Sequence, residues 1–468
     1  MAFMRPSKIE WMIAIVLFLF LFASWGHGDT RNIVGYEIDF ADSIVHGEFT
    51  NFYQRAYNRA GFIDRGYPVY DLPVNLVLGI WGLPLYLLGG IEYEGDFFKI
   101  LYGKSLFFFV FLICAFLVYK ICREFKIDDD KSQWAAFIYF TSSMAINSIC
   151  LIGNCDTLGA ALTLAGVLAY VRHKDFQCFL WFLVAFPFKQ HALFIYLPLL
   201  LLRDKNIFRI SFKLILLVAF NFICNLPIYN TPELVATKKL FTFGMVERLL
   251  VNTVPFLSGS LPVFMLLYGF LCAFCYITYK YDNENSLTLV IATVGIAITL
   301  SSMSLAHPQW FLQLAPYLAI ACVYYSKAAK DIMLFETIGT LAMLGCNYIL
   351  FNPSYGSVNA RNMLLYKLIV KPVYEGSTKF SEQNNIVTNL AINMQNTAST
   401  RGMVRIPRAT LGSIYTICMA ILVFFLFRAS NVDTQSRINY RPYALARMSL
   451  NIIACYIPLM IFVIEALR

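Results

Sequence analysis

Three acidic residues lie within six positions of one another in the segment GYEIDFADSIVHGEFTNFY, a short distance after the first strongly apolar run of the chain. They are Glu37, Asp39 and Asp42, and the last two are three residues apart, which places both on one face of a helix. A carboxylate held beside a reacting hydroxyl can take its proton as a general base. The plainer interpretation is that these acids only solvate a helix at a membrane surface.

A second cluster interrupts the long apolar stretch FQCFLWFLVAFPFKQHALFIYLPLLLL. Pro187, Lys189, Gln190 and His191 divide it into halves of about 12 or 13 residues, each short for a membrane crossing. Non-helical backbone at this depth must face a cavity or the protein interior, because lipid leaves its polar groups unsatisfied. A lysine here is costly and favours a function, whereas snorkelling towards the surface is the alternative.

The composition tells which elements must position these side chains. Of 468 residues, 59% are hydrophobic and 14% are charged, and one soluble core cannot bury that much apolar surface. Apolar runs near the 20 residues that cross a bilayer recur along the chain. We therefore expect an all-α polytopic membrane protein. Its first run, Ile9 to Trp25, lacks a good cleavage site and is expected to remain as a helix.

Basic clusters between the apolar runs predict the orientation, because short cytoplasmic loops carry the excess of Lys and Arg. Placing every cluster inside predicts about thirteen crossings, with the N-terminus inside and the C-terminus outside. The expected spans are residues 9–25, 101–120, 133–152, 156–171, 176–188, 190–202, 208–228, 256–279, 286–305, 309–326, 331–351, 409–428 and 445–466.

One apolar segment, Leu72 to Gly90, must be left out of this count, because its crossing would move every later basic cluster outside. We expect it to lie along the outer face. The outer side then holds the loops 26–100, with its juxtamembrane helices, 229–255 and 352–408, and residues 1–468 form a single transmembrane domain.

Several segments, taken in this order and on these sides, resemble a known family. They are the acidic segment after the first helix, YPVYDLP, GNCDTLGAALTLAGVLAY, FKQHALFIYLPLLLL and AHPQWFLQLAPYLAI. Together they resemble the GT-C superfamily of integral-membrane glycosyltransferases over roughly residues 1–325. The similarity is greatest to bacterial members and to mannosyltransferases that use polyprenyl-phosphate sugars.

The resemblance implies a GT-C-like bundle and an inverting sugar transfer at the outer face of the cell membrane. The donor would be a polyprenyl-phosphate sugar, and the acceptor a lipid-linked or cell-envelope glycan. Because the donor stays in the bilayer, a first-loop acid would act as general base at the interface. Asp39 is the first candidate for this base, and Asp42 and Glu37 are the alternatives.

The other roles follow from the same resemblance. The departing phosphate needs cationic donors, for which Lys189, His307 and an outer-loop arginine are available. The candidates for binding the acceptor or the sugar are Asp156, Tyr67, Tyr70 and Gln190. Four of them have a structural alternative: an interfacial histidine for His307, a helix N-cap for Asp156, and aromatic-belt anchoring for Tyr67 and Tyr70.

Other partners and classes can be weighed from the same residues. The inside loops account for the net charge of +9, so no nucleic-acid partner is expected, and the membrane lipids remain a partner. No P-loop or dinucleotide fingerprint is present; a divalent cation at Asp156 is left open as a cofactor. Two rival functions also stay open. A polysaccharide ligase or polymerase would use the late-loop arginines, and a lipid or glycan flippase would use intramembrane charges.

Overall fold

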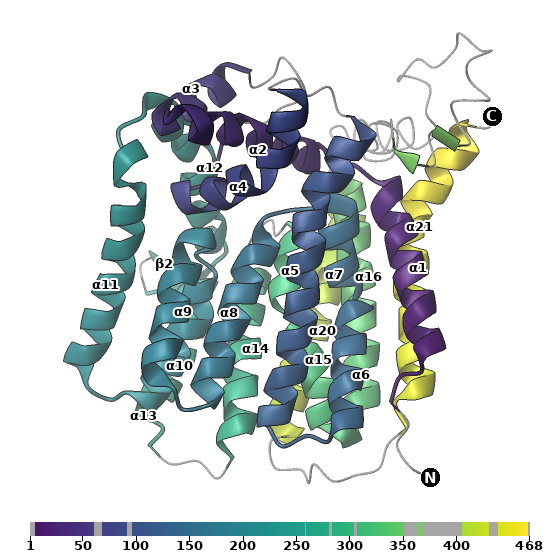
Figure 1. Ribbon diagram of the computed structural model, residues 1–468. Coiled ribbons are helices and arrows are strands. Elements are labelled where there is room, and N and C mark those ends of the chain that lie inside the picture. The colour runs from purple at the N-terminus through teal and green to yellow at the C-terminus, as the bar shows by residue number, and fades with distance from the viewer. Residues whose placement is uncertain are drawn as a thin grey trace.

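The computed structural model describes residues 5–59, 68–90, 96–257, 259–279, 283–303, 307–350, 363–364, 367–368, 405–429 and 439–466. These residues form an all-helical bundle whose only strands, within the described ranges, make one short hairpin. Figure 1 shows α1 beginning at one end of the bundle and α21 finishing at the other.

The elements follow one another along the chain. They are α1 (Lys8–Ser24), α2 (Gly28–His46), α3 (Phe49–Arg59), α4 (Leu72–Gly89), α5 (Phe97–Glu124), α6 (Asp129–Phe140), α7 (Ser143–Ile146), the π-helix η1 (Asn147–Ile152), α8 (Asp156–Val171), α9 (Asp175–Phe188), α10 (Ala192–Arg203), α11 (Ile207–Asn225), η2 (Leu226–Ile228), α12 (Pro232–Leu250), β1 (Thr253–Phe256), β2 (Gly259–Pro262), α13 (Val263–Ile277), α14 (Glu284–Ser302), η3 (Pro308–Gln313), α15 (Ala315–Tyr324), η4 (Ser326–Ala328), α16 (Ala329–Leu350), α20 (Arg405–Ala429) and α21 (Arg441–Ala466).

The first helix begins with a capping box and ends in a sharp bend. The Glu10 amide donates to Ser7 Oγ at 3.2 Å, and the Ser7 amide donates to Glu10 Oε2 at 2.6 Å, so two free helix-end donors are satisfied. After Ser24 the chain turns by 78° into α2. That helix stops at Gly47, whose φ of +71° is a conformation that glycine adopts without strain.

Helices α2, α3 and α4 gather at the end of the bundle opposite the start of α1 (Figure 1). Helix α4 packs along α2 so closely that a Cβ on Gly82 would lie 2.3 Å from the Glu37 carbonyl oxygen, and one on Gly79 would lie 2.6 Å from the Phe40 ring. Helix α4 is long and apolar enough to cross a membrane. It nevertheless packs along α2 at this end of the bundle. That this segment lies along the outer face stays a prediction.

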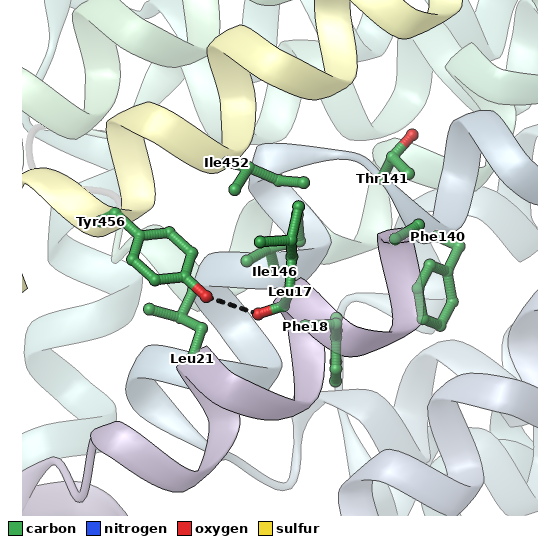
Figure 2. A pocket seen from close by; sticks show the side chains of 9 residues that line it. Leu17, Phe18, Leu21, Phe140, Thr141, Ile146, Ile452 and Tyr456 are labelled. Atoms are coloured by element: carbon green, nitrogen blue, oxygen red, sulfur yellow. Dashed lines mark hydrogen bonds between the residues drawn. The ribbon is translucent and has the colours of Figure 1, made fainter. Parts of the chain in front are cut away.

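Apolar packing holds the first and last helices against the rest of the bundle. Figure 2 shows Leu17 and Phe18 of α1 beside Phe140, Ile146 and Ile452. The gap that remains between them, about 10 Å³, is no larger than one water molecule. The hydroxyl of Tyr456 donates to the Leu17 carbonyl oxygen at 2.7 Å, so this polar tip is satisfied inside an apolar contact.

The expectation of a multi-pass membrane protein agrees with the apolar helices. Among the described residues, four helices are long and apolar enough to cross a membrane, and up to six if two bent pairs each count as one span. One predicted span is wrong at its start. Strands β1 (Thr253–Phe256) and β2 (Gly259–Pro262) pair as a hairpin, in which Thr253 pairs with Pro262, and α13 begins only at Val263. Pro255 is within β1 and Pro262 ends β2, and proline does not fit a helix interior.

A buried ion pair joins three parts of the bundle interior. The Arg447 guanidinium donates twice to the Glu336 carboxylate, at 2.7 Å each, and once to the Ile138 carbonyl oxygen at 3.0 Å. Ser142 Oγ also donates to Glu336, at 3.1 Å. The side chains of the ion pair are 5% and 2% exposed, so the contact ties α21 and α16 to the break between α6 and α7.

Candidate functional site

A cavity of about 360 Å³ opens where the first turns of α2, the start of α8 and the break between α9 and α10 meet. We call it the Lys189 cavity. Its lining is mostly polar side chains with a few aromatic and aliphatic ones. The residues are Asp29, Asn32, Ile33, Tyr36, Val69, Tyr70, Asp71, Val74, Asn154, Asp156, Pro187, Phe188, Lys189, Gln190, His191, Lys238, His307, Gln309 and Trp310.

Helix α2 contributes one face of the cavity. Asp29, Asn32, Ile33 and Tyr36 follow the i, i+3, i+4, i+7 spacing that brings side chains onto one stripe of a helix. The Asp29 amide donates to His27 Nδ1 at 3.0 Å, so His27 caps the helix start. The Asp29 side chain is 44% exposed. Its carboxylate can therefore reach a molecule bound in the cavity.

The chain that leads into α8 at the cavity is irregular. The π-helix η1 ends at Gly153, whose φ is +59°, and a Cβ there would lie 2.9 Å from Thr30 Oγ1. Thr30 donates to the carbonyl oxygen of Ile152, and buried Lys104 donates to that of Cys150 at 2.8 Å. These bonds satisfy carbonyl groups that the π-helix leaves free.

Lys104 also connects the end of η1 to the end of the first helix. Its Nζ donates to the carbonyl oxygens of Phe22 and Trp25, at 2.6 and 2.8 Å, and the residue is fully buried. The end of α1 and the end of η1 are thereby held by one ammonium group. This fixes Asp29, just after the bend, relative to Asp156, just after η1.

Lys189 and Asp156 form an ion pair in the cavity wall. Lys189 is in extended backbone directly after α9, and its Nζ lies 5.6 Å from the centre of the Trp310 ring. Gly159 of α8 makes the close approach possible, because a Cβ there would lie 2.6 Å from Lys189 Cβ. The charged residue in the helix break thus faces the protein interior, as the interrupted apolar stretch predicted.

His307 also lines the cavity, with its ring centre 4.8 Å from that of Trp310. Arg248 Nη1 lies 3.1 Å from His307 Nε2, and since a guanidinium only donates, Nε2 accepts. Burial, and secondly the charge of Arg248, lower the pKa of His307 to about 4. His307 is therefore neutral at pH 7, and the nearby positive charge is on Arg248.

Side chains from α12 and from the segment just before α4 form the rim of the cavity. Lys238 of α12 is 2.5 Å from the carboxylate of Asp71, which precedes α4. The hydroxyl of Tyr70 donates to Asn154 Oδ1 at 2.8 Å, and this bond links the rim to the start of α8.

Three buried polar atoms in the wall have neither a hydrogen-bond partner nor an ion-pair partner among the described residues. They are Asn32 Oδ1, Asp156 Oδ2 and His191 Nε2. A buried polar atom without a partner costs about 1–3 kcal/mol. Such atoms in the wall of a cavity indicate that it holds a polar ligand or ordered water.

The structure brings together most of the residues predicted for binding. Asp156, Lys189, Gln190, Tyr70 and His307 all line the cavity. Tyr67 lies outside the described residues.

The three acids predicted as the general base do not line it. Glu37, the earliest of the three in the sequence, comes eight residues after Asp29, about 12 Å further along α2. Its carboxylate is buried against α5, where a Cβ on Gly103 would lie 2.5 Å from Glu37 Oε2. Asp39 is fully buried, and Asp42 forms an ion pair with Arg55 at 2.6 Å. Only the first two turns of α2 face the cavity.

Sequence reasoning missed Asp29, Arg248 and Lys238. The signal for Asp29 was present: it is the first acid after the first apolar run, and it begins the stripe that continues through Tyr36. Arg248 and Lys238 fall in the outer loop 229–255, which nothing in the sequence marks as a helix over the cavity.

No group of three or more His, Cys, Asp or Glu side chains in the described ranges is arranged to hold a metal ion. The divalent cation considered for Asp156 stays a prediction. Comparison with protein-family models, with curated proteins and with solved structures finds no match to this chain.

Proposed function

We propose that the protein is a membrane glycosyltransferase, which moves a sugar from a polyprenyl-phosphate donor to a lipid-linked or cell-envelope glycan. The observation that carries this proposal is the Lys189 cavity. It combines an accessible carboxylate, Asp29, with a cationic group at Lys189, and Arg248 lies next to the lining residue His307. Transfer from a sugar phosphate needs both, because a hydroxyl must lose a proton while a phosphate departs.

The proposed membrane frame has thirteen crossings, with the cavity on the outer side. Each predicted span overlaps a helix of the bundle. Figure 1 shows the turns after α8 and α10, with Arg172–Lys174 and Arg203–Lys205, at the end where α1 begins. Basic turns at that end support a cytoplasmic assignment for it and for the N-terminus. The cavity and α2–α4 are at the other end.

The depth of the cavity supports a lipid-linked substrate. Helices α9 and α10 have 14 and 12 residues. Upright helices of this length rise about 21 and 18 Å, some 10 Å short of the roughly 30 Å hydrocarbon core. If both helices extend from the inner boundary of the hydrocarbon core, the break between them lies within the outer leaflet. A phosphate anchored by a polyprenyl chain can reach it there.

In the proposed reaction, the Asp29 carboxylate takes the proton of an acceptor hydroxyl. The hydroxyl oxygen forms a bond to the anomeric carbon as the bond from this carbon to the donor phosphate oxygen breaks. The electron pair of that bond leaves on the polyprenyl phosphate, whose added charge Arg248 and Lys189 stabilise. His307, being neutral, orients Arg248 through Nε2. Asp29 thus takes the role for which the sequence suggested Asp39.

Arg248 should govern donor binding. Among the described residues its side chain has no carboxylate partner, so the guanidinium can pair with a phosphate. Replacing Arg248 by Leu is expected to raise the KM for the polyprenyl-phosphate sugar roughly 10- to 100-fold, with the acceptor KM unchanged. Arg209→Leu, an exposed arginine at the other end, is the matched control. Equal donor KM values in the two variants would exclude Arg248 from the phosphate site.

The orientation can be tested with single cysteines. Glu48 and Lys174 are exposed at opposite ends of the bundle, and none of the eleven described native cysteines is exposed. In intact cells, an impermeant thiol reagent should label Glu48→Cys and leave Lys174→Cys unlabelled until the membrane is permeabilised. The reverse pattern would place the cavity inside and remove the support for an outer-face donor.

The rival functions remain separate predictions. A ligase would depend on arginines of the 352–408 loop, most of which lies outside the described residues. A flippase needs a break in membrane helices with charges beside it, which the α9–α10 break and Lys189 supply. An assay that detects donor translocation without sugar transfer would favour the flippase.

A further inference from the structure

A second hollow lies at the same end of the molecule and shares no residue with the Lys189 cavity. It has a volume of about 480 Å³ and is formed by α3, η2 and the start of α12. We call it the α3–α12 groove. Its lining consists of Thr50, Asn51, Gln54, Leu226, Pro227, Asn230, Thr231, Pro232 and Glu233.

Most of the polar side chains in this groove have free hydrogen-bonding capacity. Gln54, Asn230 and Glu233 make no side-chain hydrogen bond or ion pair within the described residues. Thr231 is at the N-cap position of α12, but its hydroxyl makes no capping bond. Only Asn51 is engaged, donating to Glu48 at 2.8 Å. Several donors and acceptors therefore converge on one space.

The kinds of side chain in the lining indicate the chemical class of the ligand. Carboxamides and hydroxyls each donate and accept, which suits the hydroxyl groups of a sugar. The lining has no Lys or Arg, and its one charged residue, Glu233, would repel a phosphate. Leu226, Pro227 and Pro232 add apolar surface for the C–H faces of a sugar ring. The groove is therefore suited to a neutral glycan.

The groove and the cavity share their supporting elements. On α3, Tyr53 donates its hydroxyl proton to the carbonyl oxygen of Tyr70, a residue that lines the cavity. On α12, Lys238 comes five residues after Glu233 and pairs with Asp71 at the cavity rim. A chain bound in the groove would thus lie beside the entrance to the cavity.

We propose that the α3–α12 groove binds the acceptor glycan through sugar units beyond the one that reacts. The role as an acceptor site rests on the proposed glycosyltransferase function, whereas glycan binding itself does not depend on catalysis.

Binding can be measured on the full chain in detergent micelles by saturation-transfer NMR. The probes are neutral trisaccharides of mannose, glucose and galactose. We expect transfer of saturation to at least one of them, reduced at least fivefold by Gln54→Leu combined with Asn230→Leu. Gln177→Leu, an exposed glutamine at the other end, and Asp29→Asn in the cavity should leave the signal unchanged.

The proposal would be overturned if none of the three trisaccharides received saturation from the protein. It would also be overturned if the saturation-transfer signal of the groove variant equalled that of the wild type. The result is independent of the proposed reaction. If trisaccharides bind in the groove but no polyprenyl-phosphate sugar is consumed, the proposed function fails and the groove stands. If the protein transfers sugar and the groove variant keeps the wild-type acceptor KM, the groove assignment fails and the proposed function stands.

Discussion

Replacing Asp29 by Asn is expected to lower the rate of sugar transfer by roughly 10²- to 10⁴-fold, the usual contribution of a general base. Asn keeps the shape of the side chain but cannot take a proton from the acceptor hydroxyl. The donor KM should change little, because the cationic groups at Lys189 and Arg248 remain. The measurement is transfer from a radiolabelled polyprenyl-phosphate sugar by the purified protein.

Asp39→Asn is the matched control for this experiment. It makes the same chemical change on the same helix, at a fully buried position that does not line the cavity. We expect it to retain transfer activity, with any loss following a loss of folded protein. If Asp39→Asn were inactive while folded and Asp29→Asn were active, the base would be Asp39, as the sequence alone suggested.

The second large effect concerns stability. Replacing Arg447 by Met should lower the free energy of unfolding by about 3–5 kcal/mol, because the Glu336 carboxylate would stay buried without its partner. Thermal unfolding in detergent micelles, followed by intrinsic fluorescence, measures the change. Adding Glu336→Leu should restore part of the loss, since removing both charges leaves only the smaller cost at Ser142 and at the Ile138 carbonyl group.

An exposed ion pair provides the comparison. Arg172 and Glu124 are 2.7 Å apart with side chains 37% and 35% exposed, so Arg172→Met should cost no more than about 1 kcal/mol. Similar unfolding temperatures for Arg447→Met and Arg172→Met would show that the buried pair does not hold α16 and α21 to the α6–α7 break.

Several features of the fold could be predicted because they depend on local sequence. Apolar runs of membrane length indicated the helices, since each run must bury or solvate its own surface in lipid. The interruption at Lys189 predicted a break facing the protein interior, and the α9–α10 junction lines the cavity. The start of α13 was misplaced, because hydropathy does not distinguish an apolar hairpin from a helix.

The choice among the acids after the first helix depended on tertiary structure. Helical spacing showed which of them share a face, but not where α2 would pass over α8. The bend after Ser24 and the carbonyl groups held by Lys104 set that position, and they bring Asp29 to the cavity while Glu37 is packed against α5.

The sequence by itself determined that this chain forms many apolar helices, some long enough to cross a membrane, and that the chain breaks at Lys189. Only the tertiary structure decided which distant residues meet: Asp156 with Lys189, Arg248 with His307, and Glu336 with Arg447. The physical reason is the distance along the chain over which each kind of signal acts. Hydropathy and helical period act over a few turns of one chain segment, whereas these pairs are 33, 59 and 111 residues apart, and the packing of whole helices sets their distances.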